Sequence, residues 1–435
     1  MACHQLSHCL RTLFHLGSKN IWVALSPSGN FTSSRFRKLH PICSLSTSPL
    51  NRGYCRAVSS ANNVESEQVL HRNVPFDFPH TQIKSPNLDT SNGRVMLIDG
   101  TSIIYRAYYR LLAKLHHGHL SHADGNGDWV LTIFTALSLI IDVLEFLPSH
   151  VVVVFDHDGF PFGHTSLSTK QNLVAKGLNF RHNMYPSYKS NRPPTPDTIV
   201  QGLQFLKASL KAMSVKVIEV PGVEADDVIG TLAVRSVDAG FKVRVVSPDK
   251  DFFQILSPSL RLLRIAPRGF EMVSFGMEDF AGKYGGLKPS QFVDLISLTG
   301  DKSDNIPGVH GIGDVHAIQL IMKFGTLENL LERVEQVEEE RIRKVLLSNA
   351  ELARLSKDLA ILRCDLPSYM VPFAPDDLIF EKPEDGGEKF TSLLTAISAY
   401  AEGFSADTII RRALYLWKKL EKQNTYTLHQ KLLSA

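Results

Sequence analysis

Five carboxylates in the middle of the chain have the types and spacing of a metal site; they are Glu224, Asp226, Asp227, Asp249 and Asp251. The first three follow a β-branched run at 215–220 and the other two follow a similar run at 242–246, with a helical apolar pattern between them. Because the carboxyl ends of neighbouring parallel strands share one rim of a sheet, we expect the two acidic groups to meet there. Carboxylates packed this closely take up protons or bind cations, and oxygen ligands without intervening His or Cys favour a hard cation, Mg²⁺ or Mn²⁺.

Four further acids extend this group. Asp99 and Asp156 each end an apolar run that predicts a buried strand, and Asp301 and Asp304 lie three positions apart, about one helical turn. At an effective dielectric constant of about 20, one pair of like charges about 4 Å apart costs about 4 kcal/mol. Nine carboxylates in one groove therefore argue against a purely structural role, and two divalent ions would offset much of the repulsion. Two such ions could activate a water and stabilise the leaving oxygen in phosphodiester cleavage.

Basic and aromatic side chains are interleaved in the stretch 180–192, just before a Pro-rich turn. The residues with a candidate role are Arg181, Tyr185, Tyr188, Lys189 and Arg192. Cations could contact phosphate groups while the aromatic rings stack on bases. An ordinary charged surface loop is the alternative interpretation of the same composition.

A glycine-rich turn precedes a predicted helix that begins near Asp314. Gly308, Gly311 and Gly313 would let the backbone approach a phosphate, whose charge is favoured by the exposed N–H groups at the start of the helix. Such a turn alone is a weak signal. Beside the acidic groove it predicts a helix-hairpin-helix clamp that grips duplex DNA through phosphates, independently of sequence.

The first 64 residues differ from the rest of the chain in charge. They contain seven Lys or Arg and no Asp or Glu, so the remainder has 40 basic and 44 acidic residues, a net charge of about −4. This leader is rich in Ser and Arg, which is typical of an organellar transit peptide rather than a secretory signal, although a tail without function is the alternative. Four of the five cysteines lie in it, so the mature chain, with only Cys364, can form no internal disulfide. The apolar stretch 129–147 is interrupted by two acids, and no membrane span is expected.

Six stretches, in order along residues 94–370, resemble the successive motifs of the 5′→3′ exonuclease domain of bacterial DNA polymerase I, a member of the flap endonuclease superfamily. They read RVMLIDG, VVVVFD, FRHNMYPSYKSNRPPTPD, VPGVEADDVIGTLA, VVSPDKDFFQIL and LTGDKSDNIPGVHGIGDVHA. The resemblance implies an α/β fold: a mostly parallel central sheet flanked by helices, which is a PIN-like or resolvase-like 5′ nuclease core, with a helical arch and a C-terminal helix-hairpin-helix region. Between Asp156 and Phe180 the chain is longer than the bacterial pattern.

The resemblance also divides the chain. The parts are a transit peptide at 1–64, a linker at 65–93, a catalytic α/β domain at 94–275 with an arch at 180–213, a helix-hairpin-helix region at 276–370 and a helical extension at 371–435. No polymerase or proofreading domain is expected, so the chain is similar to a free-standing organellar exonuclease of plants.

Residue by residue, the resemblance implies that all nine carboxylates belong to a centre that binds two Mg²⁺ (or Mn²⁺) ions. Lys189 and Arg181 match basic residues that approach the scissile phosphate, and Arg106 matches a further phosphate contact. Tyr185 or Tyr188 would stack on a base, with Arg192 as a further DNA contact. The hairpin glycines would grip duplex DNA, and the family often binds K⁺ there.

The function implied is a Mg²⁺-dependent 5′-3′ exonuclease or flap endonuclease in organellar DNA replication and repair. Its partners would be DNA with 5′ flaps, nicks or RNA primers and an organellar DNA polymerase; the protein would be a monomer located in plastids, mitochondria or both. Two alternatives are a superfamily ribonuclease acting on organellar RNA and a noncatalytic protein that binds DNA structures.

Overall fold

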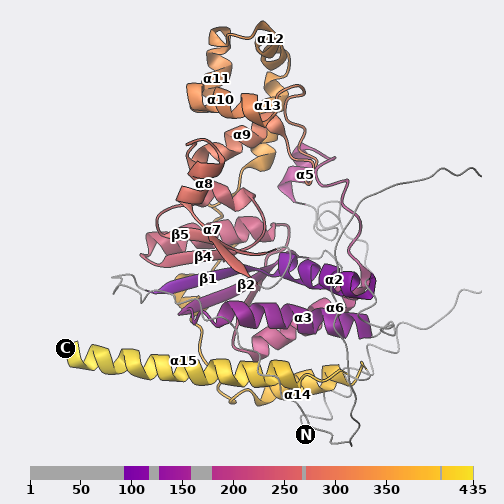
Figure 1. The fold of residues 1–435 in the computed structure, drawn as a ribbon, viewed down its shortest axis with the longest axis vertical. Coiled ribbons are helices and arrows are strands. Elements are labelled where there is room, and N and C mark those ends of the chain that lie inside the picture. The colour runs from indigo at the N-terminus through magenta and orange to yellow at the C-terminus, as the bar shows by residue number, and fades with distance from the viewer. Residues whose placement is uncertain (1–92, 117–126, 158–178, 267–270, 402–403, 435) are drawn as a thin grey trace, which may run out of the picture. The chain divides into compact units, whose positions relative to one another are not determined.

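A six-stranded sheet organises the part of the chain that the computed structural model describes, residues 93–116, 127–157, 179–266, 271–401 and 404–434 (Figure 1). All of these lie in the second of the two units into which the chain divides, 1–83 and 84–435. The predicted transit peptide and nearly all of the extra residues before Phe180 lie outside the described residues.

The sheet has the order β3-β2-β1-β4-β5-β6. The strands are β1 (Arg94–Asp99), β2 (His150–Phe155), β3 (Lys216–Glu219), β4 (Lys242–Val246), β5 (Leu260–Ile265) and β6 (Met272–Phe275). All neighbours are parallel except β5 and β6, which are antiparallel. The mostly parallel sheet is therefore confirmed.

Alternate residues of β1 enter two different cores. Val95 and Leu97 pack on the side of α7 (Ala225–Asp238), whereas Met96 and Ile98 pack on the side of α2 (Gly100–His116) and α3 (Gly127–Leu144). Because both faces are covered, the strand is apolar at successive positions rather than at every second one. α3 has the length and hydropathy of a membrane-spanning helix, but 72% of it is buried inside the fold.

The stretch 180–213, predicted to form an arch, contains two helices with different surroundings. α5 (Phe180–Met184) is short, and α6 (Asp197–Ala212) is a core helix whose apolar face contacts α3. Leu206 and Leu210 of α6 are fully buried in the same core as Ile133 of α3. Ile199 and Leu203, in the first half of α6, also line the cavity at the sheet rim, so α6 contributes to both the core and the groove.

The region after the sheet is helical. Its helices are α8 (Met277–Lys283), α9 (Phe292–Thr299), α10 (Asp314–Phe324), α11 (Leu327–Glu332), α12 (Glu340–Ser348) and α13 (Ala350–Ala360). α9, a glycine-containing turn and α10 form the predicted helix-hairpin-helix. It is positioned by α13, which packs along α9.

The last two helices complete the core beneath α3 and α6 (Figure 1). α14 (Glu388–Ser398) and α15 (Asp407–Ser434) bury Phe390 and Trp417, whose ring centroids lie 5.7 Å apart. Arg412 of α15 pairs with Asp142 of α3 and with Glu145, which directly follows α3. The C-terminal extension is thus an integral layer of this fold.

We expect Trp417→Ala to lower the free energy of unfolding by about 3–5 kcal/mol, because the indole is 1% exposed and leaves a cavity. Tyr415→Ala on the same helix is the matched control, since its ring is 58% exposed and its loss should change stability by no more than about 0.5 kcal/mol. Denaturant titration measures both. Equal, small effects would show that the extension is not part of the core.

Candidate functional site

Four of the five parallel strands, β1 to β4, bring carboxylates to one rim of the sheet. Asp99 ends β1 and Asp156 follows β2. Glu224 and Asp226 lie at the start of α7, directly beyond β3, and Asp249 lies just beyond β4. The predicted meeting of acids from separate strands is therefore confirmed.

Hydrogen bonds fix two of these carboxylates. Asp99 accepts the Ser102 N–H at 2.8 Å and the Ser247 hydroxyl at 2.8 Å, which joins the ends of β1 and β4. Asp156 accepts the N–H of Ala225 at 2.8 Å, which joins the end of β2 to the first turn of α7. The backbone geometry of the rim thus orients the acids before any ligand binds.

Two adjoining cavities divide the acids between them. The first, of about 940 Å³, is lined by Asp99, Asp156, Glu224, Asp226 and Asp249. The second, of about 330 Å³, is lined by Asp249, Asp251, Asp301 and Asp304. Eight of the nine predicted ligands therefore lie at these cavities, which share Asp249, and the ninth, Asp227, lines neither.

Four of the carboxylates in the cavities resist ionisation: Asp99, Asp226, Asp249 and Asp251. Burial, with a contribution from the Asp156 charge, raises the pKa of Asp99 to about 6. Burial and the charges of Asp249 and Asp99 raise the pKa of Asp226 well above its usual value, and burial and Asp249 do the same for Asp251. The charged forms therefore need a counter-cation.

A hard divalent cation fits this donor set, because the buried oxygens are numerous and repel one another. In the described residues no three Asp, Glu, His or Cys side chains already converge on a single ion position. The side chains that would hold such a cation line the two cavities.

Lys189 lines the first cavity beside its carboxylates. Its Nζ lies 2.5 Å from a Glu224 oxygen and 3.6 Å from Asp304, and its backbone N–H donates to the Asp304 carbonyl at 2.9 Å. Burial would lower the pKa of Lys189, but the charges of Glu224, Tyr188 and Asp304 together outweigh burial and raise it. Burial would likewise raise the pKa of Glu224, yet Lys189 and Arg181 lower it to about 2. The predicted phosphate-directed lysine thus lies at the groove with a full charge.

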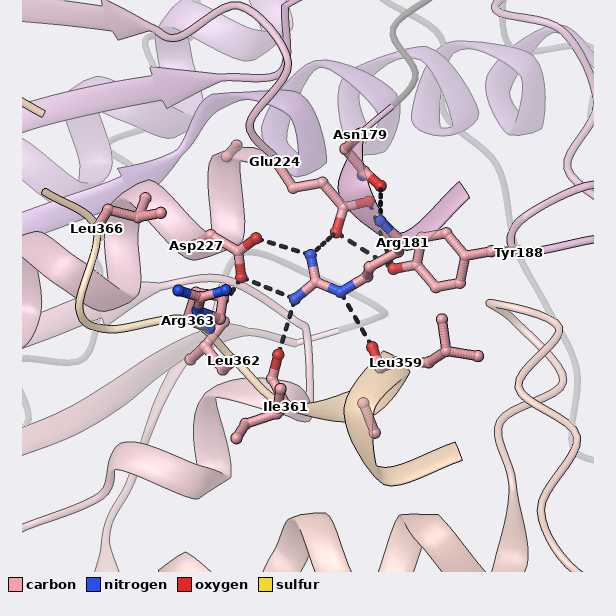
Figure 2. A network of polar contacts seen from close by, with 12 residues as sticks. Asn179, Arg181, Tyr188, Glu224, Asp227, Leu359, Ile361, Leu362, Arg363 and Leu366 are labelled. Atoms are coloured by element: carbon pink, nitrogen blue, oxygen red, sulfur yellow. Dashed lines mark hydrogen bonds and ion pairs between the residues drawn. The ribbon is translucent and has the colours of Figure 1, made fainter. Parts of the chain in front are cut away.

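Arg181 lies elsewhere than predicted (Figure 2). Its guanidinium is buried and pairs with Glu224 at 2.8 Å and Asp227 at 2.7 Å. It also donates to the carbonyls of Leu359 at 3.0 Å and Ile361 at 2.7 Å. The expectation that Arg181 approaches a scissile phosphate is wrong for this structure, because its donors are engaged inside the protein.

Asp227 needs the corresponding correction. Its side chain is 1% exposed, and its two oxygens accept from Arg181 at 2.7 and 2.9 Å. One of them also accepts the N–H of Arg363 at 3.0 Å. A carboxylate with these partners stabilises the fold and is not positioned as a metal ligand.

Tyr188 is buried as well, which contradicts its predicted stacking on a base. Only 3% of it is exposed, and its hydroxyl donates towards Glu224 at 3.2 Å and Asp304 at 3.3 Å. Tyr185 is half-buried beside it, and its stacking role stays a prediction. Arg192 is exposed and pairs with Asp304 at 2.5 Å, at the mouth of both cavities.

Arg106 projects from α2 outside both cavities. One of its terminal nitrogens donates to the carbonyl of Ala266, and its Nε is buried without a partner in the described part of the structure. Burial, followed by the charge of Arg110, lowers the pKa of Arg106. The structure thus does not bring Arg106 together with the carboxylates.

The hairpin glycines have different roles. Gly308 is buried with φ +62°, its N–H donates to the Ser356 hydroxyl at 3.0 Å, and a Cβ there would meet Gly300 at 2.3 Å. Its predicted contact with DNA is therefore wrong, and close packing explains the glycine. Gly311 and Gly313 are exposed, and Gly313 directly precedes α10, so their phosphate contacts stay predictions.

The sequence interpretation missed a segment that ties the site to the helical region. Asp227 and Arg235 on α7 hold the backbone of residues 359–371. Asp227 accepts the N–H of Arg363, and Arg235 donates to the carbonyls of Leu366 and Val371 at 2.6 Å. The hydroxyl of Thr231 accepts another N–H from the segment at 3.3 Å. The signal available in the sequence was the spacing of Asp227, Thr231 and Arg235, which lie four positions apart and so share one face of the helix.

Two family models match the chain. Residues 94–285 match a 5′-3′ exonuclease N-terminal resolvase-like domain, and residues 287–386 match a 5′-3′ exonuclease C-terminal SAM fold. The chain is 35% identical over 289 residues to DNA polymerase I of Bacillus caldotenax and 35% identical over 281 residues to the thermostable DNA polymerase I of Thermus filiformis. These alignments cover 66% and 65% of this chain and 30% of each relative, so the chain spans less than a third of the relatives' length.

Solved structures are also similar to the chain. The T5 D15 protein, co-crystallised with metal ions, is 20% identical, with coverage of 70% of this chain and 99% of that chain and a TM-score of 0.47. The catalytic core of Rad2 in complex with DNA substrate is 17% identical, with coverage of 75% and 93% and a TM-score of 0.45. Residues 387–435, which include α14 and α15, lie outside both family models.

Proposed function

Because the chain belongs to the 5′-3′ exonuclease family, that of the exonuclease domain of DNA polymerase I, we propose that it is a structure-specific 5′ nuclease. Its reaction is hydrolysis of phosphodiester bonds in DNA that carries 5′ flaps, nicks or RNA primers. The observation that carries the proposal is the gathering of eight carboxylates at two adjoining cavities, the first of which Lys189 also lines, within the part of the chain that matches the family. DNA as substrate is supported by the curated relatives, which are DNA polymerases.

Two divalent cations, Mg²⁺ by the oxygen donors present, would be held by the acids of the two cavities. Bound there, they would supply activation of a water and stabilisation of the leaving oxygen. The chain itself orients the donors: Ser102 and Ser247 hold Asp99, and the N–H of Ala225 holds Asp156. Lys189, which lines the first cavity, would donate to the phosphate that reacts.

The cellular setting is part of the same proposal. The acid-free leader supports delivery to plastids or mitochondria, where flaps and RNA primers arise during DNA replication and repair. An organellar DNA polymerase would supply these substrates, and the nuclease would act as a monomer. A K⁺ ion at the exposed hairpin glycines would help to hold duplex DNA.

Cleavage by residues 65–435 tests the function directly. The substrates are a 5′-flap duplex, a blunt duplex and single-stranded RNA, each with and without Mg²⁺. We expect Mg²⁺-dependent cutting near the flap junction. Cleavage of RNA alone would transfer the protein to RNA turnover, and binding without cutting would reject catalysis.

Lys189→Ala should reduce the rate of cleavage by about 10²–10³-fold, because one charge-stabilising donor is lost from the cavity. Mg²⁺ affinity should not weaken, since the lysine competes for Glu224 rather than supporting it. Lys189→Arg, which keeps the charge, should retain more activity than the alanine variant. Single-turnover rates across a Mg²⁺ titration separate the two effects, and a loss explained entirely by weaker Mg²⁺ binding would contradict the role.

A further inference from the structure

The second cavity carries cations beside its carboxylates. Four basic side chains line it, Arg192, Lys250, Arg264 and Lys283. Arg192 already pairs with Asp304 at 2.5 Å, and Lys250 pairs with Asp301 at 3.2 Å. Within the described part of the chain, Arg264 and Lys283 make no ion pair with a carboxylate. Their positive charge is therefore available to an external anion.

One buried aromatic ring holds both of these cations in place. The Arg264 guanidinium lies 5.9 Å and the Lys283 ammonium 5.7 Å from the centroid of the Phe253 ring. Lys283 also lies 5.2 Å from the ring centroid of Tyr284, and Arg264 donates to the Pro248 carbonyl at 3.0 Å. Cation–π contacts of this kind stabilise a charge without neutralising it.

Phe253 is itself held rigidly. It is fully buried, and its ring stacks on that of Phe275 at 4.7 Å and contacts Phe292 edge-on at 5.4 Å. It belongs to the short 3₁₀ helix Asp251–Ile255, which begins with one of the acids of the cavity. The two cations are thus positioned by the same turn that positions the carboxylates.

An anion at this position must tolerate neighbouring carboxylates, so an isolated acidic side chain is a poor ligand. A phosphodiester suits the site better, because its oxygens can face the cations here while the adjoining phosphate reaches the first cavity. The two cavities share Asp249, which places them next to each other along any chain of phosphates.

We propose that Arg264 and Lys283 bind the sugar–phosphate backbone of the substrate beside the bond that is cut. They would act as positioning residues that hold the strand at the second cavity, which adjoins the cavity that Lys189 lines. This inference deepens the proposed nuclease function and rests on it.

The test uses single-turnover cleavage of a 5′-flap duplex by the full chain, with the enzyme concentration varied at several KCl concentrations. For Arg264→Gln and for Lys283→Gln, we expect the half-saturating enzyme concentration to rise about 10-fold and the rate at saturation to stay within about 2-fold. The logarithm of the half-saturating enzyme concentration is plotted against the logarithm of the salt concentration. The slope of this plot should fall by about 0.7–0.9 per cation removed, the value for one lost phosphate contact. Arg264→Lys, which keeps the charge, should retain most of the slope.

Lys216→Gln is the matched control. Its ammonium also lies over an aromatic ring, 4.7 Å from the Phe373 centroid, but it is on β3 and lines neither cavity. Its substitution should leave the slope unchanged, and equal effects at Lys216 and Lys283 would overturn the inference. Effects confined to substrates with a 5′-terminal phosphate would overturn it too, since they would indicate an end-binding site. A wild-type chain that cuts no substrate would instead reject the nuclease function.

Discussion

Replacing Asp226 with asparagine is expected to reduce Mg²⁺-dependent cleavage by about 10³-fold or more, equivalent to about 4 kcal/mol of activation free energy, while making the Mg²⁺-free protein more stable. Burial and the charges of Asp249 and Asp99 raise the pKa of Asp226 well above 3.8. The ionised side chain therefore destabilises the fold at neutral pH, and the neutral amide removes that cost. The same substitution removes one charge from the groups that hold the cations.

The pH dependence of this effect has a definite sign. Because the pKa of Asp226 is higher in the folded state, its protonated form favours folding below about pH 4, and this contribution is lost as the pH rises through the folded pKa. The gain in melting temperature from Asp226→Asn should thus be near zero at acid pH and largest at neutral pH in the presence of EDTA.

Melting curves recorded with EDTA measure the stability of the Mg²⁺-free protein, and those recorded with Mg²⁺ measure the stabilisation by the bound cation. Added Mg²⁺ should raise the melting temperature of the wild type, as expected for a ligand that binds only the folded state, and should raise that of the variant much less. Asp358→Asn, an exposed acid of α13, is the control and should change neither quantity. Wild-type turnover by Asp226→Asn would reject the carboxylate centre.

Arg181→Met is expected to lower the free energy of unfolding by about 3–5 kcal/mol. The substitution leaves Asp227, which is 1% exposed, as an unpaired buried charge, and it frees the carbonyls of Leu359 and Ile361 (Figure 2). The double variant Arg181→Met with Asp227→Leu should recover most of this loss, because no buried charge then remains without a partner.

The control for Arg181 is Arg192→Ala. The side chain of Arg192 is 50% exposed in its pair with Asp304. Exposed ion pairs contribute no more than about 1 kcal/mol to the free energy of unfolding. Denaturant titration of the two single variants and the double variant supplies the comparison. If Arg181→Met left stability within about 1 kcal/mol and yet slowed cleavage, Arg181 would be a phosphate-binding residue after all.

The sequence alone determined the parts of this protein that depend on neighbours in the chain. Continuous apolar runs predict strands that are covered on both faces, and acids directly after those runs must lie at one rim of a parallel sheet. For this reason Asp99, Asp156 and Asp226 could be assigned to a common groove before any contact was known. Six motifs in the correct order were sufficient to predict the family.

Tertiary structure alone decided which polar side chains face the groove. The bonds of Arg181 join it to carbonyls 178 and 180 positions further along the chain, a distance over which periodicity has no information. Arg181 and Asp227 have the residue types of a phosphate-binding group and a metal ligand, but they neutralise each other in the interior. Arg264 and Lys283 resemble ordinary surface cations in the sequence. Only the folded chain places them beside one buried ring and one row of carboxylates, because that position depends on packing between α8, β5 and the turn after β4.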